Sequence, residues 1–240
     1  MYYSQYKQDY FLDKVIFSRK KNGFFIDIGA YDGISISNSY FFEKNRNWNG
    51  FCFEPNPTVF SKLIKNRKCQ CFNVCIGDSK GMVIFTQVIG NSEMLSGISR
   101  TYDPRHVERI VKETKSNDGQ IFQISVVSKT LKSFFKAKNH EIDFLSIDTE
   151  GNEFEILKSI DFNQLSIKVI LVENNYNNRE IFAYLSKFKY LRLTRLSCDE
   201  VYIRSDFYSI EIRFRLILFK IDRRIYLHSL GLRKILRKWI

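Results

Sequence analysis

Acidic side chains accompany the ends of three predicted strands in the N-terminal part of this 240-residue chain. Asp27 lies in the first strand, in FFIDIGAYDG, Glu54 ends the second, in GFCFEP, and Asp78 follows the third, in NVCIGDSKG. An acid at the end of a strand in a doubly wound sheet accepts hydrogen bonds from ribose hydroxyls. We therefore expect a nucleoside site, with Glu54 at the ribose and Asp78 at the adenine edge.

The glycine turn after the first strand indicates which nucleoside is bound. Its order is Asp27-x-Gly29-x-x-x-Gly33 with no following Lys, whereas phosphate-binding turns read G-x-G-x-x-G or G-x-x-x-x-G-K-[ST]. A carboxylate beside the turn opposes a pyrophosphate but suits a cation. S-adenosylmethionine, a sulfonium without phosphates, fits better than NAD. The alternative is structural: the glycines would serve a tight turn, and Glu54 would cap the helix after Pro55.

More acidic residues follow the fourth and fifth strands of the predicted parallel sheet, in Asp148-Thr149-Glu150-Gly151 and Glu173-Asn174. Asp148, Glu173 and Asn174 offer the oxygen ligands that Mg²⁺ or Mn²⁺ prefers, and a metal there would lower the pKa of a substrate hydroxyl. Without a metal, Asp148 or Glu150 would be the catalytic general base. The alternative is that Glu150 and Glu153 only interact favourably with the dipole of the following helix.

The elements that position these acids alternate along the chain. Strands are predicted over 24–29, 50–55, 71–77, 142–148 and 168–174, and helices over 34–46, 57–67, 152–160 and 177–188. Continuous apolar strands separated by helices predict an α/β fold, a mostly parallel sheet with helices on both faces. The segments YLRLTRL and DEVYIR predict a late antiparallel strand pair within 190–204.

One stretch interrupts this alternation. Predicted strands at 81–88 and 121–128 flank an insertion, 89–120, with a charged helical pattern at 105–115. Long insertions in compact domains are usually functional, so we expect a lid over the acceptor pocket. Its expected contacts with a polar or anionic acceptor are Arg100, Tyr102, Arg105 and His106.

Six motifs, in this order, give the chain a family resemblance: YSQYKQD, FIDIGAYDGISISNSYFFE, GFCFEPNP, NVCIGD, LSIDTEGNEFEIL and VILVENNY. Over about residues 4–204 the sequence resembles the FkbM-type family of S-adenosylmethionine-dependent methyltransferases. The resemblance implies a Rossmann-like methyltransferase fold and O-methylation of a sugar, glycan or natural-product hydroxyl. It implies cofactor contacts at Asp27, Gly29, Ala30, Asp32, Gly33, Glu54 and Asp78. The acids after the fourth and fifth strands are similar to the metal ligands of catechol-type O-methyltransferases.

The net charge of +12 is concentrated at the C-terminus. The last 28 residues hold nine basic side chains and one acid, Asp222, so they carry +8. We expect a methyltransferase domain at 1–204 and a basic tail at 205–240. In the tail, Leu232, Ile235, Leu236 and Trp239 recur at helical spacing, which predicts peripheral membrane association through 206–240. The alternative is packing on its own domain or on a second subunit.

Location and competing functions follow from composition. Five cysteines without a C-x-x-C pair indicate a reducing compartment, and the polar N-terminus lacks a signal-peptide pattern, so we expect a cytoplasmic protein. The computed isoelectric point of 9.4 keeps two rivals open, a non-catalytic basic binding module and a nucleic-acid methyltransferase. The second is disfavoured because Asp148-Thr149-Glu150-Gly151 replaces the Asn/Asp-Pro-Pro-aromatic motif of base-methylating enzymes.

Overall fold

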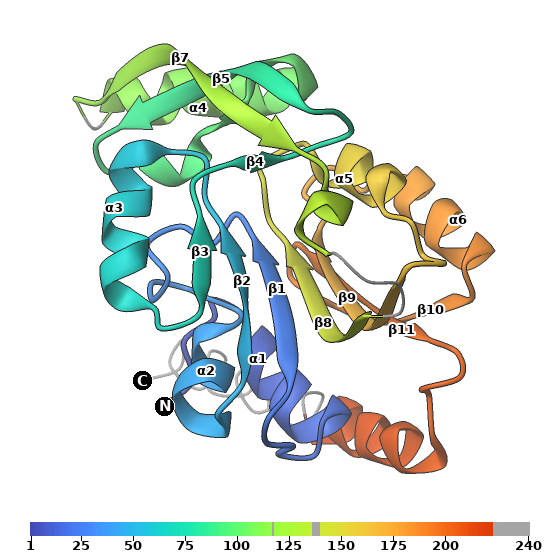
Figure 1. Ribbon diagram of the computed structural model, residues 1–240. Helices are drawn as coiled ribbons and strands as arrows, with labels where there is room; N and C mark the ends of the chain where they lie inside the picture. The colour runs from blue at the N-terminus through green and yellow to red at the C-terminus, as the bar shows by residue number, and fades with distance from the viewer. Residues whose placement is uncertain (117, 136–139, 223–240) are drawn as a thin grey trace, which may run out of the picture.

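A seven-stranded sheet forms the centre of the protein (Figure 1). The computed structural model describes residues 1–116, 118–135 and 140–222. The strand order is β10-β11-β9-β8-β1-β2-β3. The bounds are β1 Phe24–Ile28, β2 Asn49–Phe53, β3 Gln70–Phe72, β8 His140–Ile147, β9 Leu165–Glu173, β10 Tyr190–Leu196 and β11 Asp199–Arg204. Neighbouring strands from β3 to β9 are parallel, whereas β11 is antiparallel to β9 and β10. The predicted Rossmann-like fold and late antiparallel pair are therefore confirmed.

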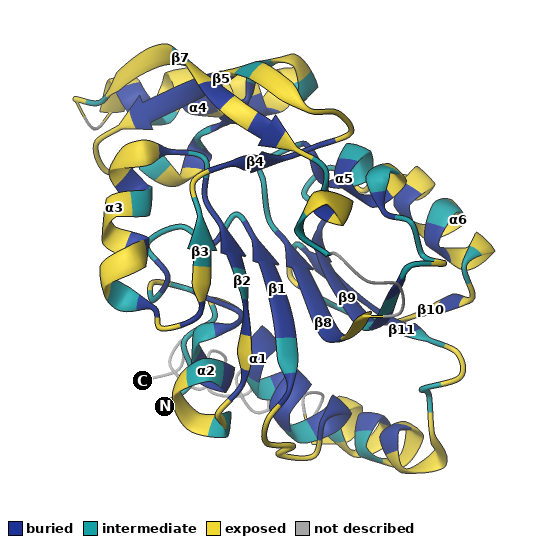
Figure 2. Ribbon diagram, in the orientation of Figure 1, coloured by how far each residue is buried: buried dark blue, intermediate teal, exposed yellow. Residues whose placement is uncertain are grey.

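Both faces of the sheet are buried, as continuous apolar strands require. Phe25 of β1 packs into one apolar cluster and its neighbour Ile26 into the other. The first cluster is covered by the N-terminal helical segment, α1 Gln8–Phe11 and the π-helical Leu12–Ile16, and by α2 Tyr40–Arg46 and α3 Pro57–Asn66. The second is covered by α5 Glu153–Ser159 and α6 Arg179–Lys187. Figure 2 shows the central strands buried along most of their length.

Two predicted elements differ from the structure. The helix predicted from residue 34 begins at Tyr40, because Asp32 accepts hydrogen bonds from the backbone N–H groups of Ile34 and Ser35 and holds them in a turn. The strand predicted over 71–77 breaks after Phe72. Its second part, β4 Cys75–Ile76, joins another sheet.

That second sheet has the order β4-β7-β5-β6. The strands predicted at 81–88 and 121–128 are confirmed as β5 Gly81–Ile89 and β7 Gln120–Lys129, which pair antiparallel. Between them lie three-residue 3₁₀ turns, β6 Gly97–Ile98 and α4 Pro104–Ser116, so the insertion is structured and its charged helix is confirmed. In Figure 1 this unit sits beyond the arrowheads of β1 and β2.

A further helix, 210–222, follows β11 at the end of the described residues and packs on the first apolar cluster through Ile212 and Leu216. Among the residues that the structure describes, no helix has the length and apolarity needed to cross a bilayer. The apolar positions predicted at Leu232, Ile235, Leu236 and Trp239 lie outside the described residues.

Candidate active site

Strand register places the predicted acids along one edge of the sheet. Ile28 pairs with Phe53 and Ile147, and Ile147 pairs with Val172. The residues that follow these four are Gly29, Glu54, Asp148 and Glu173. The carboxyl ends of parallel strands meet at the same edge, which is where such sheets bind ligands.

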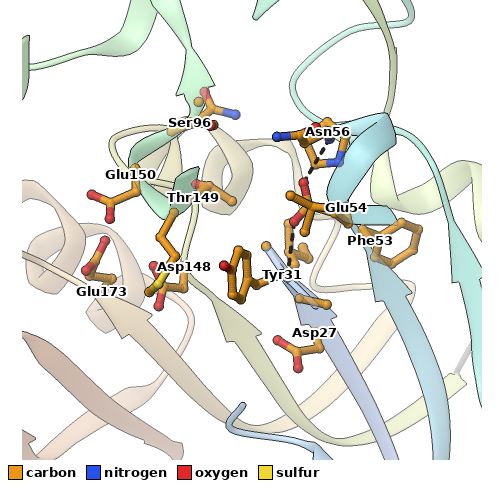
Figure 3. A pocket seen from close by; sticks show the side chains of 18 of the residues that line it. Asp27, Tyr31, Phe53, Glu54, Asn56, Ser96, Asp148, Thr149, Glu150 and Glu173 are labelled. Atoms are coloured by element: carbon orange, nitrogen blue, oxygen red, sulfur yellow. Dashed lines mark hydrogen bonds between the residues drawn. The ribbon is translucent and has the colours of Figure 1, made fainter. Parts of the chain in front are cut away.

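A cavity opens at this edge between the main sheet and the insertion (Figure 3). Its volume is about 1280 Å³, including the space open to solvent at its mouth. Much of the lining comes from the β1 turn, the end of β2, the loop after β8, the end of β9 and the insertion. It includes Asp27, Gly29, Ala30, Tyr31, Glu54, Asn56, Glu93, Ser96, Gly97, Arg109, Asp148, Thr149, Glu150 and Glu173.

The two glycines of the turn have different surroundings. Gly29 has φ +85°, and an added Cβ would lie 1.7 Å from the backbone oxygen of Asp148, so only glycine lets the ends of β1 and β8 approach this closely. Gly33 has φ +83° and packs on Leu63 and Arg67 outside the cavity. Asp32 also lies outside the cavity lining, since its carboxylate holds the turn described above.

Glu54 is buried, with its carboxylate fixed by two backbone donors. Tyr31 N–H donates to Oε2 over 3.1 Å and Asn56 N–H to Oε1 over 2.8 Å (Figure 3). Burial raises the pKa of Glu54 to about 7. The cap of α3 is Asn56, whose side chain accepts from Thr58 N–H. Glu54 therefore does not cap the helix, and it keeps lone pairs for a ligand.

Asp27 lies on the cavity wall but has a partner within the protein. Its carboxylate accepts a hydrogen bond from the hydroxyl of Ser39, which also accepts one from Arg67 over 3.0 Å. Burial raises the pKa of Asp27, and the nearby Arg67 guanidinium opposes this shift. The carboxylate thus belongs to a buried polar network beneath the glycine turn.

Three carboxyl groups form a cluster on the other wall. Asp148, Glu150 and Glu173 each place an oxygen so that all three atoms lie within 4.8 Å of one another. Burial and then the neighbouring Asp148 raise the pKa of Glu150 to about 8, while burial and then Glu150 raise that of Glu173 to about 9. The pKa of Asp148 is raised by burial and by Glu173. The cluster therefore retains protons at neutral pH.

The loop that presents this cluster is fixed by Glu153. Its Oε1 accepts from Thr149 N–H, the Thr149 hydroxyl and Gly151 N–H, each over 2.9 Å. Glu150 adopts φ +57°, which is uncommon for a side-chain-bearing residue. Glu150 precedes α5, and its carboxylate belongs to the cluster. Glu153 lies in the first turn of α5 and is the acid that interacts with the helix dipole.

Helix α4 of the insertion meets the acid cluster. His106 Nδ1 lies 3.3 Å and Arg109 Nη1 3.8 Å from Glu150 Oε2. His106 is buried, and its Nε2 lies 3.1 Å from the carbonyl oxygen of Leu95. It contacts the acid cluster on the side away from the cavity and does not line the cavity. Arg109 does line the cavity. Arg109 was not among the predicted contacts, although it lies one helical turn after His106.

The other expected acceptor contacts lie apart from the main cavity. Arg100 forms an ion pair with Asp78 over 3.0 Å at the surface. Asp78, an expected cofactor contact, does not line the cavity. Arg105 pairs with Asp103 and stacks on Tyr176 at 4.3 Å. Tyr102 donates to the carbonyl oxygen of Leu95 and lines a second, smaller cavity beside the acid cluster.

Asn174, an expected metal ligand, closes the turn before α6. Its Oδ1 accepts from Asn178 N–H over 2.7 Å and its Nδ2 donates to Asn178 O over 3.1 Å. The three carboxyl oxygens that could bind one metal ion therefore come from Asp148, Glu150 and Glu173, and Glu150 takes the place expected for Asn174.

The turn and the insertion are connected by one contact that sequence reasoning missed. The Tyr31 hydroxyl donates to Glu93 Oε1 over 2.5 Å, and Lys62 pairs with the same oxygen over 2.8 Å. Nothing in the sequence around Glu93 marks it, because the contact depends on how the second sheet packs over the first.

A parallel sheet with the register described above and an acid-lined cavity at its carboxyl edge is the architecture of Rossmann-like methyltransferases. The profile of the methyltransferase FkbM domain matches residues 27–201, so the chain belongs to the FkbM methyltransferase family. The resemblance stated from the motifs is thus confirmed.

Two solved structures are similar to this chain. The methyltransferase FkbM from Methylobacillus flagellatus KT shares 12% identity, over 77% of this chain and 44% of that one, with a TM-score of 0.44. TrmK from M. capricolum, solved with S-adenosyl-homocysteine, shares 13% identity, over 80% of this chain and 65% of that one, with a TM-score of 0.39. The match spans less than two thirds of either protein. No curated protein sequence matches the chain.

Proposed function

We propose that this methyltransferase binds S-adenosylmethionine in the main cavity and methylates a hydroxyl oxygen of a sugar, glycan or natural product. The observation that carries the proposal is the position of the Asp148, Glu150 and Glu173 cluster on the same cavity as the ribose acceptor Glu54. One acid serves the nucleoside, and the cluster offers a proton acceptor for the hydroxyl.

The cofactor side of the cavity fits a nucleoside without phosphates. Two backbone N–H groups hold the Glu54 carboxylate in place, so it can accept from ribose hydroxyls without first being ordered. The acid cluster gives the other end of the cavity a negative potential once its protons leave, which suits a sulfonium and an ammonium group.

The acceptor side follows from the cluster. When bound, S-adenosylmethionine supplies a methyl group that bonds to the acceptor oxygen as the bond from carbon to sulfur breaks. The proton of the hydroxyl passes to a carboxylate, and Asp148 and Glu150 are the candidates. A general base must be ionised and works best with a pKa near the operating pH; the pKa of Glu150, about 8, leaves a fraction of this carboxyl ionised at neutral pH and most of it ionised at higher pH. The products are S-adenosylhomocysteine and a methyl ether.

The smaller cavity supports a sugar-like acceptor. It shares Glu150 and Glu173 with the main cavity, so the acid cluster lies between the two. Its own lining includes aromatic rings and an amide, namely Tyr102, Tyr176 and Asn174, and the amide of Asn175 lines both cavities. Rings that cover an apolar sugar face and amides that bond its hydroxyls are the groups such a ligand needs.

A divalent cation is compatible with the same cluster. Three carboxylates whose oxygens lie within 4.8 Å of one another match the preference of Mg²⁺ and Mn²⁺ for oxygen ligands. Asp148, Glu150 and Glu173 would hold the ion, which would lower the pKa of the acceptor hydroxyl. Activity that is lost in a chelator and returns with Mg²⁺ or Mn²⁺ would support this role; full activity in excess chelator would leave the carboxylates as base.

Isothermal titration with S-adenosylhomocysteine tests the cofactor, and transfer of labelled methyl groups to a panel of glycans and nucleotide sugars tests the acceptor. We expect binding to the wild type and to Asp148→Asn, with transfer only by the wild type. The absence of S-adenosylhomocysteine binding, or tighter binding of NAD, would contradict the proposal.

A further inference from the structure

The helix over 210–222 has apolar side chains on two opposite faces. Its inner face packs on the domain: Ile212 and Leu216 are buried in the first apolar cluster, and the ring centre of Phe219 lies 4.9 Å from that of Phe11. These three residues follow the spacing of one helical face. The inner face therefore accounts for the attachment of this helix to the protein.

The outer face carries five large apolar residues that nothing described in the structure covers. Ile210, Phe214, Ile217, Leu218 and Ile221 are each at least 48% exposed, and Ile210 reaches 78%. Their spacing of four, three, one and three residues places them along one stripe, here called the outer stripe. A helix with apolar side chains on both faces is usually covered on both, and a contiguous exposed stripe marks an interaction surface.

The helix cannot easily turn this stripe inward. Arg215 Nε donates to the carbonyl oxygen of Val15 over 2.8 Å, and its Nη2 to that of Ile16 over 3.4 Å. Together with the buried Ile212 and Leu216, these bonds fix the rotation of the helix on the domain. The outer stripe is thus held in an exposed position by its own domain.

Charge indicates what covers the stripe. Residues 213–240 carry +8, and the exposed Arg213 and Lys220 belong to the same helix as the stripe. Apolar residues beside clustered basic ones suit an anionic lipid surface, where each basic residue adds attraction. A second copy docked on the stripe would bring two +8 segments together, and five side chains are few compared with the 20 to 30 residues a side of a typical stable interface.

We propose that the full chain binds anionic membrane surfaces through the outer stripe, with the helix 210–222 lying along the headgroup region. This inference is independent of the proposed reaction. The helix lies at the opposite end of the parallel strands from the cavity (Figure 1), so contact through the stripe would leave the cavity open to its ligands.

Vesicle flotation of the full chain tests this proposal. The variant Phe214→Glu with Leu218→Glu places two charges on the stripe, and both side chains are exposed, so the fold should persist. The matched control is Met82→Glu with Ile84→Glu, two exposed apolar residues of β5 on the other sheet. Thermal unfolding of each variant, which should resemble that of the wild type, shows whether folding is intact.

The wild type and the β5 control should float with vesicles of phosphatidylcholine and phosphatidylserine, and not with phosphatidylcholine alone. The stripe variant should bind at least about tenfold more weakly, since it loses the burial of two large apolar side chains. Equal flotation of the stripe variant and the wild type would overturn the proposal, as would no flotation of either. A lipid-free dimer that only the stripe variant abolishes would also overturn it, in favour of a second copy.

Discussion

Glu150 and His106 face each other where the insertion meets the main sheet, with Oε2 of the acid 3.3 Å from Nδ1 of the imidazole. The His106 Nε2 faces the carbonyl oxygen of Leu95, so its proton sits there and Nδ1 is the bare nitrogen of a neutral ring. Burial lowers the pKa of His106, whereas the pKa of Glu150 is raised to about 8. A protonated Glu150 can therefore donate to Nδ1, and His106 positions the acid.

Replacing His106 should slow methyl transfer while leaving the cofactor in place. In His106→Ala, Glu150 loses the group that orients it, and we expect transfer to fall about tenfold to 100-fold. Affinity for S-adenosylhomocysteine should change less than about twofold, because His106 lies behind the cluster. Single-turnover rates and calorimetry separate the two effects, with Val107→Ala, an exposed neighbour, as control. Equal losses in rate and affinity would indicate collapse of the insertion instead.

Glu54 should carry much of the cofactor affinity. Glu54→Ala removes a buried acceptor of hydrogen bonds from the ribose; a charged hydrogen bond contributes about 1.5–3 kcal/mol, so the dissociation constant should rise tenfold or more. Lys65→Ala, an exposed residue of α3 outside the cavity lining, serves as the control and should bind normally. Titration calorimetry with S-adenosylhomocysteine measures both. Equal affinities of Glu54→Ala and the wild type would show that the ribose does not bind at Glu54.

The same carboxyl group should make cofactor affinity depend on pH. Its pKa is about 7 without ligand, and ribose hydroxyls that donate to it favour the ionised form. Binding then releases a proton, so affinity should rise from about pH 6 to about pH 8 and level off above the free-state pKa. Calorimetry in buffers of different ionisation enthalpy counts the proton. The Glu54→Gln variant should lose this dependence, and a wild-type affinity that falls over the same range would show the opposite linkage.

The sheet and the acids at its edge could be predicted because both depend on local pattern. Strands β2, β8 and β9 are largely apolar, and a strand that ends at a fixed residue places the next residue at the edge of a parallel sheet. Glu54, Asp148 and Glu173 were found in this way. Their positions needed no knowledge of distant contacts.

The remaining features depend on contacts between distant segments. Asp78 lies away from the cavity because the predicted third strand breaks and its second part, β4, joins the other sheet. Asn174 turns to Asn178, a local bond that competes with its expected role as a ligand. Arg109 and Glu93 reach the cavity through packing of the insertion, which periodicity alone does not reveal.

The insertion over 89–120 should become more protected when both ligands bind. It supplies Glu93, Ser96, Gly97 and Arg109 to the cavity, so ligands there would contact it directly. Hydrogen exchange of its amides should slow with S-adenosylhomocysteine and acceptor together. The edge strand β10 of the main sheet serves as the internal reference. Unchanged exchange over 89–120 under these conditions would count against a lid.

Glu173→Gln should stabilise the free protein at alkaline pH while it impairs transfer. The carboxyl of Glu173 has a pKa of about 9 in the folded protein, above the ordinary value of about 4.3, because burial and then Glu150 disfavour its charge. The folded state thus binds more protons than the unfolded state between these values, and stability falls as pH rises through that range. Removing the charge should therefore raise the free energy of unfolding measurably at about pH 9 and change it little at about pH 4. Thermal unfolding at both pH values measures the difference, with Glu155→Gln, on the exposed side of α5, as the matched control. A Glu173→Gln variant destabilised equally at both would show that this carboxyl is a structural hydrogen-bonding group and that the cluster stores no electrostatic strain.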